Sequence, residues 1–136
     1  MPRFQESNFE TITIDEIVPT AKKCKEEGLA FVQICAIVRE ASCELLYSYD
    51  DGKNAADSIH GYLVDVPDGE HVPSITSLYP AAFVFENETH DLFGVEIDDI
   101  SIDFEGNFYT VAVAYPMNPR AAKAKEDADG KEAADE

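Results

Sequence analysis

Apolar residues recur at helical spacing in two stretches of the chain. In the first, Thr13 stands three residues before Glu16, as a helix capping box requires, and apolar residues follow at every third or fourth position. Gly28 suits the end of this helix, and Pro19 predicts either a kink or a late start. The second stretch predicts a helix over residues 77–93. One side of that helix is a stripe that should face the core: Leu78, Ala82, Phe85, Thr89 and Leu92.

The stretches around these helices have the patterns of β-strands. Residues 30–38, AFVQICAIV, are almost continuously apolar, which predicts a central strand buried on both faces, with Cys35 as a buried reduced thiol. Further strands are predicted over residues 11–14, 43–49 and 58–66, and a hairpin over residues 100–115. Helices and strands do not alternate strictly. We therefore expect an α+β fold, a two-layer sandwich in which a mixed β-sheet carries two main helices packed on one face.

The chain has 136 residues, a length that suits one domain with a genuine core. We assign residues 1–118 to this single α+β domain. From residue 119 onward the sequence PRAAKAKEDADGKEAADE contains no aromatic or β-branched side chain. Such a segment cannot bury enough apolar surface to offset the entropy lost on ordering. The sequence therefore predicts a disordered, charged C-terminal tail over residues 119–136.

The charge of the chain restricts its partners. It carries 28 acidic and 10 basic residues, a formal charge of −18, so its surface should repel nucleic acid and anionic lipid heads. No stretch approaches the roughly 20 apolar residues of a membrane span, and the N-terminus lacks the apolar core of a signal peptide. The three cysteines form no Cys-x-x-Cys unit. We therefore expect a cytoplasmic chain that binds neither nucleic acid, nor a metal, nor an iron–sulfur cluster by itself.

Acidic residues and a histidine cluster on the second predicted helix. Glu86 and His90 are four residues apart, and Glu88 and Asp91 are three apart, so each pair shares a helix face. A pair of carboxylates can serve acid–base catalysis if burial raises one pKa. However, the chain offers no obvious nucleophile or phosphate loop, and Glu86 with His90 supplies fewer ligands than a zinc ion needs. An acidic surface that binds a basic partner is the simpler interpretation.

The residues before and along this helix also resemble a known family. Pro73, Ser74 and Ile75 precede the helix, Ala81 and Ala82 form a small pair on it, and Glu86, Glu88, Asp91, Phe93 and Gly94 follow. This order and spacing are similar to the signature of the 30-kilodalton-type subunit of respiratory complex I and of its relatives in membrane-bound nickel–iron (NiFe) hydrogenases. The order of predicted elements over residues 11–97 also resembles that family. Within it, the resemblance is nearest to the short version in energy-converting hydrogenases.

Two departures from the family pattern support this choice of branch. Asn87 stands where members from respiratory complexes typically have arginine. After Gly94, the usual His-Pro-x-Leu-Arg-Arg segment is replaced by the acidic sequence IDDISIDFEG. Both differences are easier to reconcile with the hydrogenase relatives, so a subunit of a complex I-type dehydrogenase is the second possibility. A third is an acidic protein-binding module unrelated to redox complexes.

The resemblance implies a non-catalytic role without a cofactor. The chain would be an accessory or scaffold subunit that holds a NiFe hydrogenase-type large subunit and iron–sulfur electron-transfer subunits together. It would reach the inner face of the cell membrane only through those partners. The residues expected at the subunit interface are Pro73, Ser74, Glu86, Asn87, Glu88, His90, Asp91, Phe93 and Gly94.

Overall fold

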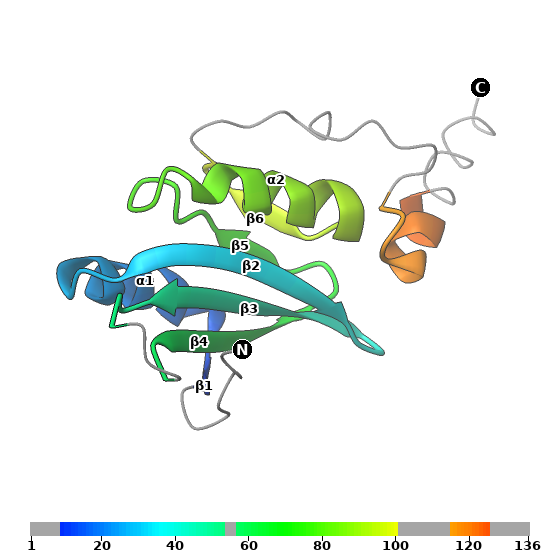
Figure 1. Ribbon diagram of the computed structural model, residues 1–136. Helices are drawn as coiled ribbons and strands as arrows, with labels where there is room; N and C mark the ends of the chain where they lie inside the picture. Colours follow the sequence, from blue (N-terminus) through cyan, green and yellow to red (C-terminus); the bar gives the residue numbers. More distant parts are fainter. Residues whose placement is uncertain (1–8, 54–56, 101–114, 126–136) are drawn as a thin grey trace.

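A computed structural model describes residues 9–53, 57–100 and 115–125 of the chain. Its elements, labelled as in Figure 1, are β1 (Phe9–Ile12), the 3-10 turn η2 (Ile14–Glu16), α1 (Ile17–Glu26), β2 (Ala30–Val38), β3 (Ser42–Asp50), β4 (Ile59–Pro67), β5 (His71–Pro73), α2 (Ala82–Phe93) and β6 (Glu96–Asp98). A further helical segment covers residues 119–125. None of the helices in these described ranges is long and apolar enough to cross a membrane.

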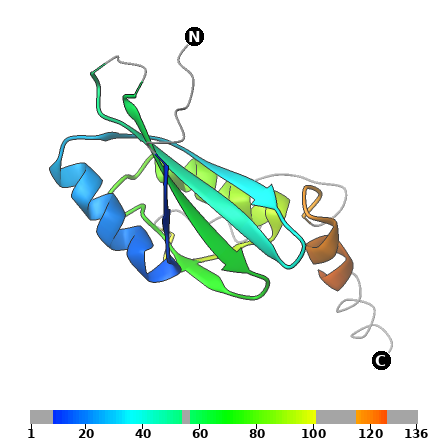
Figure 2. The same cartoon turned by 90° about the horizontal axis from the view of Figure 1, so that it is seen from below.

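Four strands form one mixed sheet in the order β1-β4-β3-β2. β2, β3 and β4 run antiparallel as a meander, and β1 pairs in parallel with the outer side of β4. α1 and α2 both contact the inward face of this sheet (Figures 1 and 2), where Phe31 of β2 meets Phe85 of α2 and Cys24 of α1 lies beside Tyr62 of β4. This confirms the predicted α+β sandwich with two main helices on one face.

The core follows directly from the alternation along β3. Residues 43, 45, 47 and 49 point inward and are buried, whereas their neighbours point to the other side of the sheet. Side chains from both helices and from the second sheet complete this core, which includes Ile17, Ala21, Cys24, Ile34, Leu45, Tyr47, Tyr49, Val64, Val66, Val72, Ile75 and Ala82. One continuous apolar layer therefore holds the sheet to both helices.

The start of α1 agrees with the capping pattern of the sequence. The backbone N–H of Thr13 donates to Glu16 Oε1 at 3.1 Å. The capping box formed by Thr13 and Glu16 therefore stands at η2, which directly precedes α1. α1 itself begins at Ile17, so Pro19 lies in its first turn and interrupts no hydrogen bond. The late start that Pro19 predicts is confirmed. Gly28, with φ +79°, follows the helix end as expected.

The position of β2 differs from its prediction. The strand forms the edge of the sheet rather than its centre, and its side chains alternate between half-buried or buried inward positions and exposed outward ones. Cys35, expected to be buried, is exposed. The prediction was wrong because a continuous apolar run usually means that both faces are covered, and no described element covers the outer face of β2.

Residues 119–125, the first part of the predicted tail, are helical. Side-chain hydrogen bonds to distant loops order this segment, and apolar patterning gives no sign of them. The rest of the predicted tail, and the predicted hairpin beyond residue 100, lie outside the described residues. The short parallel pair β5–β6 was not predicted, because three-residue strands carry no measurable periodicity.

Candidate functional site

The site that the sequence singled out is built from α2 and from the loop between β5 and α2. The carboxylate of Glu86, on the first half of α2, faces this loop. Glu86 Oε1 accepts hydrogen bonds from Ser74 Oγ at 2.8 Å and from the backbone N–H of Ile75 at 2.9 Å. The hydroxyl oxygens of Ser74 and Thr76 are 2.6 Å apart, so they share a hydrogen bond within the loop. The two parts of the sequence motif, twelve residues apart, are therefore a single hydrogen-bonded unit.

Glu86 is a buried carboxyl group with an incomplete set of partners. Its side chain is 1% exposed, and Oε2 accepts no hydrogen bond within the described residues. Burial raises the pKa of Glu86 to about 7, although the hydrogen bonds from Ser74 and Ile75 oppose the rise. Burial, with Glu86 as a smaller second cause, also raises the pKa of the Tyr47 phenol. At neutral pH this carboxyl group is therefore partly protonated.

The predicted exposed acidic face of α2 is not present. Glu86, Asn87 and Asp91 are only 1%, 1% and 3% exposed. The prediction assumed that a helix packed on a sheet exposes its opposite face to solvent. Here Ala82 and Thr89 of the predicted stripe are buried together with the polar residues Glu86, Asn87 and Asp91, whereas Leu78, Phe85 and Leu92 are half-buried. Glu88 and His90 are half-buried, and so are the remaining interface candidates Pro73, Ser74, Phe93 and Gly94.

Buried polar groups on α2 bond to their own helix. Asn87 Nδ2 donates to the Phe83 carbonyl at 2.8 Å, and Thr89 Oγ1 donates to the Phe85 carbonyl at 2.7 Å. His90 Nδ1 lies 2.8 Å from Asp91 Oδ1. A neutral amide at position 87 can be buried in this way. An arginine there would need a charged partner or a path to water.

The C-terminal end of α2 is shaped by a close approach. Gly94 has φ +74° and donates its N–H to the His90 carbonyl, which ends the helix as predicted. A Cβ atom at this position would lie 2.8 Å from Ala121 Cβ and 3.0 Å from the ring of Tyr115. Glycine is therefore required both by the left-handed backbone and by the packing of the C-terminal segment.

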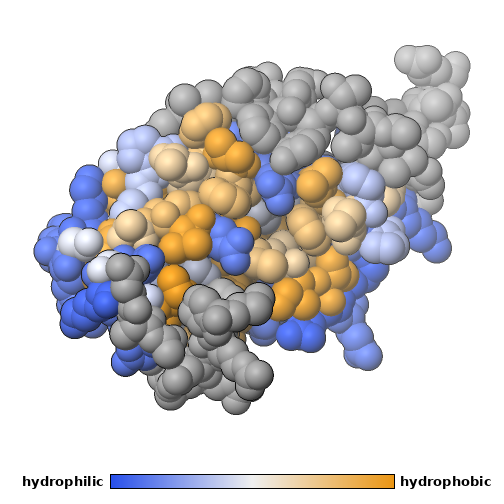
Figure 3. Space-filling view, viewed as in Figure 1, coloured by the Kyte–Doolittle hydropathy of each residue, from blue (hydrophilic) through white to orange (hydrophobic). Residues whose placement is uncertain are grey.

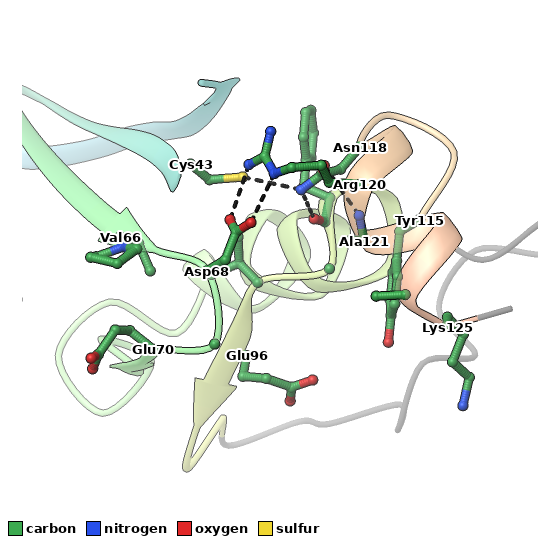
Figure 4. A pocket seen from close by; sticks show the side chains of 16 residues that line it. Cys43, Val66, Asp68, Glu70, Glu96, Tyr115, Asn118, Arg120, Ala121 and Lys125 are labelled. Atoms are coloured by element: carbon green, nitrogen blue, oxygen red, sulfur yellow. Dashed lines mark hydrogen bonds and ion pairs between the residues drawn. The ribbon is translucent and has the colours of Figure 1, made fainter. Parts of the chain in front are cut away.

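Residues 115–125 fasten onto this end of the molecule, and we call them the C-terminal clasp. Asn118 Nδ2 donates to the Phe93 carbonyl at 2.9 Å and lies 3.3 Å from Cys43 Sγ. Arg120 forms a bidentate ion pair with Asp68, in which Nε donates to Oδ2 at 2.8 Å and Nη2 donates to Oδ1 at 3.0 Å. The same guanidinium also donates to the carbonyls of Arg39 and Ser42. In Figure 4 the side chains of Arg120 and Asn118 extend from the clasp toward Asp68 and Cys43. Sequence patterning gave no signal for this clasp.

A cavity of about 360 Å³ lies between the clasp, the end of α2 and the β4–β5 turn. Apolar side chains such as Val66, Phe93 and Val95 form part of its wall, and Glu70 and Glu96 lie at its margin. Burial raises the pKa of the Cys43 thiol beside it. A thiol protonated in this way is a poor nucleophile, so the cavity has no activated group for covalent chemistry at Cys43.

The other histidines form isolated pairs with carboxylates. His60 Nε2 lies 3.1 Å from Asp51, and His71 Nδ1 lies 2.9 Å from Asp98. The hydrogen bond to Asp98 raises the pKa of His71. Across residues 9–53, 57–100 and 115–125, no group of three or more His, Cys, Asp or Glu side chains is arranged to hold a metal ion. The His71–Asp98 pair joins β5 to β6, and the His60–Asp51 pair joins β4 to the residue that follows β3.

The fold and the site together define a small α+β sandwich whose most distinctive motif, Ser74 with Glu86, fixes a loop to a helix. The sequence profile of the family described as "Respiratory-chain NADH dehydrogenase, 30 Kd subunit" matches residues 11–103. This chain belongs to that family, which confirms the family resemblance of the motif.

Comparison with solved structures supports the fold. The chain is similar to a chain in the structure of the membrane-bound sulfane sulfur reductase, an archaeal respiratory membrane complex, with a TM-score of 0.70 and 22% sequence identity. The similarity covers 82% of this chain and 67% of the other. No curated protein sequence gives a significant match.

Proposed function

We propose that this chain is a cofactor-free accessory subunit of a membrane-associated NiFe hydrogenase of the energy-converting type. It docks the catalytic large subunit and the iron–sulfur electron-transfer subunits. In this role it lies on the cytoplasmic side and reaches the membrane only through its partners. The observation that carries the proposal is the unit formed by Ser74, Ile75 and Glu86, because it preorganises the family's signature loop and helix as one rigid surface.

The docking surface in this proposal is narrower than the sequence suggested. Glu86 holds the loop from inside and does not touch the partner. The half-buried side chains around it, Ser74, Glu88, His90 and Phe93, are the ones that can contact another subunit. Asn87, buried and bonded within α2, fits a version of the family that does not use arginine at this position. This supports the hydrogenase branch.

A subunit of a complex I-type dehydrogenase is the second candidate, favoured by the description of the matching family. The two candidates predict different partners. They are separated by purifying the tagged full-length chain from its native membranes with mild detergent and identifying co-purifying subunits by mass spectrometry. A NiFe large subunit supports the proposal. Subunits that bind NADH and flavin would replace it with the second candidate. An unrelated basic protein would favour an acidic binding module.

The docking surface is tested in the same preparation with Glu88→Arg. A charge at an interface contributes chiefly to register and specificity, so its reversal should reduce recovery of the large subunit roughly tenfold. Glu26→Arg, at an exposed position on α1, makes the same change of charge elsewhere and should leave recovery unchanged. Equal recovery with both variants would remove Glu88 from the interface.

A further inference from the structure

The face of the sheet opposite the helices exposes an apolar row that crosses three strands. Cys35 on β2 pairs with Leu46 on β3, which pairs with Leu63 on β4. All three point away from the core, because their neighbours Ile34, Leu45 and Val64 point into it. Cys35 is exposed, and the two leucines are half-buried. We call the side of β2, β3 and β4 that carries this row the outer face.

Exposed aliphatic side chains extend the row along β2. Val32 is 40% exposed and Ile37 is 36% exposed. Figure 3 shows apolar residues over α2 as well as over β2 and β3 in the orientation of Figure 1, with hydrophilic residues among them. Exposed apolar side chains gathered on one face of a protein often mark an interaction site.

The composition of β2 adds an independent argument. Its nine residues include no charged residue and no proline, although the strand lies at the edge of the sheet. Edge strands of proteins that act alone are commonly protected from unwanted association by charges, prolines or β-bulges; β2 has a register shift between Phe31 and Gln33 but no charge and no proline. The sequence of β2 is that of a covered strand, and within the described residues nothing covers its outer side.

On part of the outer face, the chain covers itself. The ring of Phe9 on β1 lies across Gly61, where a Cβ atom would meet it at 2.8 Å. The next row, Cys35–Leu46–Leu63, ends at Thr11 and has no such cover from β1. The contrast places the uncovered area at the row Cys35–Leu46–Leu63, away from Gly61.

Acidic residues border this area on one side and indicate what can occupy it. The row after Cys35 consists of Ile37, Glu44 and Asp65. Asp65 is exposed, and Glu44 pairs with Arg39 at 3.2 Å. A second copy of the chain would bring another formal charge of −18 and the same acidic border. An anionic lipid surface is disfavoured for the same reason. A complementary occupant is a protein surface that is apolar at its centre and basic at one margin.

We propose that the outer face of β2, β3 and β4 is a second docking surface, which binds an apolar patch of another subunit bordered by lysine or arginine beside Asp65 and Glu44. The inference rests on the proposed function only in that the chain works within an assembly. It concerns the side of the sheet opposite to α1 and α2. The chain therefore lies between two neighbours rather than at the margin of the complex.

Cys35 provides a direct reporter for this surface. It is exposed, whereas Cys24 and Cys43 are buried and their thiol pKa values are raised by burial. In the purified, folded full-length chain, N-ethylmaleimide should therefore modify Cys35 first. In the complex isolated from native membranes, Cys35 should react at least tenfold more slowly. Peptide mass spectrometry measures the modification, and Cys35→Ser is the control that removes the rapid signal.

Photo-crosslinking identifies the occupant. Benzoylphenylalanine at position 37 of the full-length chain should crosslink, in the native complex, to an apolar segment of a different subunit that has Lys or Arg nearby. Asp65→Lys should lower incorporation of the chain into the complex roughly tenfold, as expected for reversing a charge at an interface margin. Glu26→Lys makes the same charge change on the exposed side of α1 and should have no effect.

Several results would overturn the proposal. These are equal modification of Cys35 in the free and assembled chain, protection of Cys35 in the free monomer, and crosslinks to a second copy of the chain or to phospholipid. The proposed function can fail separately. If Cys35 is protected by another subunit but no NiFe large subunit co-purifies, the docking surface stands and the hydrogenase assignment falls. If the large subunit co-purifies and Cys35 stays reactive, the hydrogenase assignment stands and the second docking surface falls.

Discussion

The buried carboxyl group of Glu86 predicts a specific dependence of stability on pH, which the substitution Glu86→Gln should remove. Glutamine has the shape of the protonated acid. It keeps an oxygen to accept from Ser74 Oγ and from the Ile75 N–H, and it places an NH₂ group where Oε2 is buried without a partner among the described residues. The substitution therefore preserves the link between loop and helix and abolishes only the ionisation.

The size and sign of the effect follow from the pKa. A rise from the ordinary value of 4.5 to about 7 means that the folded chain binds the proton more tightly than the unfolded chain does. Stability from this group is fully present below pH 4.5 and is lost progressively as the pH rises to about 7. One pKa unit corresponds to roughly 1.4 kcal/mol, so the whole loss is about 3 kcal/mol. Above about pH 7 the contribution of Glu86 to the free energy of unfolding changes no further.

The assay is urea unfolding followed by circular dichroism, for wild type and Glu86→Gln, at intervals between pH 4.5 and 8.5. The stability of the variant relative to wild type should rise by about 3 kcal/mol across this range, whatever constant offset the new amide introduces. Glu26→Gln, on the exposed side of α1, is the control for loss of a carboxylate. Parallel curves for wild type and Glu86→Gln would refute the argument, because they would show that Glu86 titrates alike in the folded and unfolded chain.

Three further predictions concern the end of α2, the clasp and the second sheet. Gly94→Ala should lower the free energy of unfolding in urea by about 2 kcal/mol or more. Gly28→Ala is the control, because Gly28 has a similar φ but open space around it, and it should lower the free energy by only about 1 kcal/mol. Equal losses would contradict the close approach at Gly94. Arg120→Lys cannot reproduce the bidentate ion pair, so amide exchange in residues 117–122 should accelerate several-fold by mass spectrometry while the sheet is unaffected. Asp98→Asn should lower the pKa of His71 in an NMR titration, and an unchanged pKa would show that their hydrogen bond is not formed in solution.

Much of the fold was predictable, because period-two and period-3.6 patterns report which side of an element is buried. The alternation in residues 43–49 and the spacing from Ile14 to Cys24 gave β3 and α1 nearly at their observed ends. The same logic failed for β2. A pattern of apolar residues shows that a surface should be covered, but it does not show whether the cover is in the same chain.

The structure joins the two parts of the predicted motif through Ser74 and Glu86, but Glu86 is buried rather than exposed. Spacing placed Glu86 and the Pro73–Ser74 segment in one motif, and the structure shows Ser74 and Glu86 in contact. It could not show that Glu86 is buried, because an acidic side chain on a helix is normally solvated and only a tertiary partner makes its burial tolerable. Whether Ser74, Glu88 and His90 contact another subunit stays a prediction.

The clasp sets an order on folding during synthesis. Arg120 bonds to Asp68 and to the turn between β2 and β3, across sequence separations of 52 and 78 or more residues. These contacts close long loops and can form only after residue 120 has been made. The sheet and α2 can pack earlier, whereas Asp68 and the turn between β2 and β3 lack their hydrogen bonds until Arg120 has been made. A newly made chain that stops short of this residue would therefore present the sheet and α2 without the hydrogen bonds that join Asp68 to the turn between β2 and β3 through Arg120.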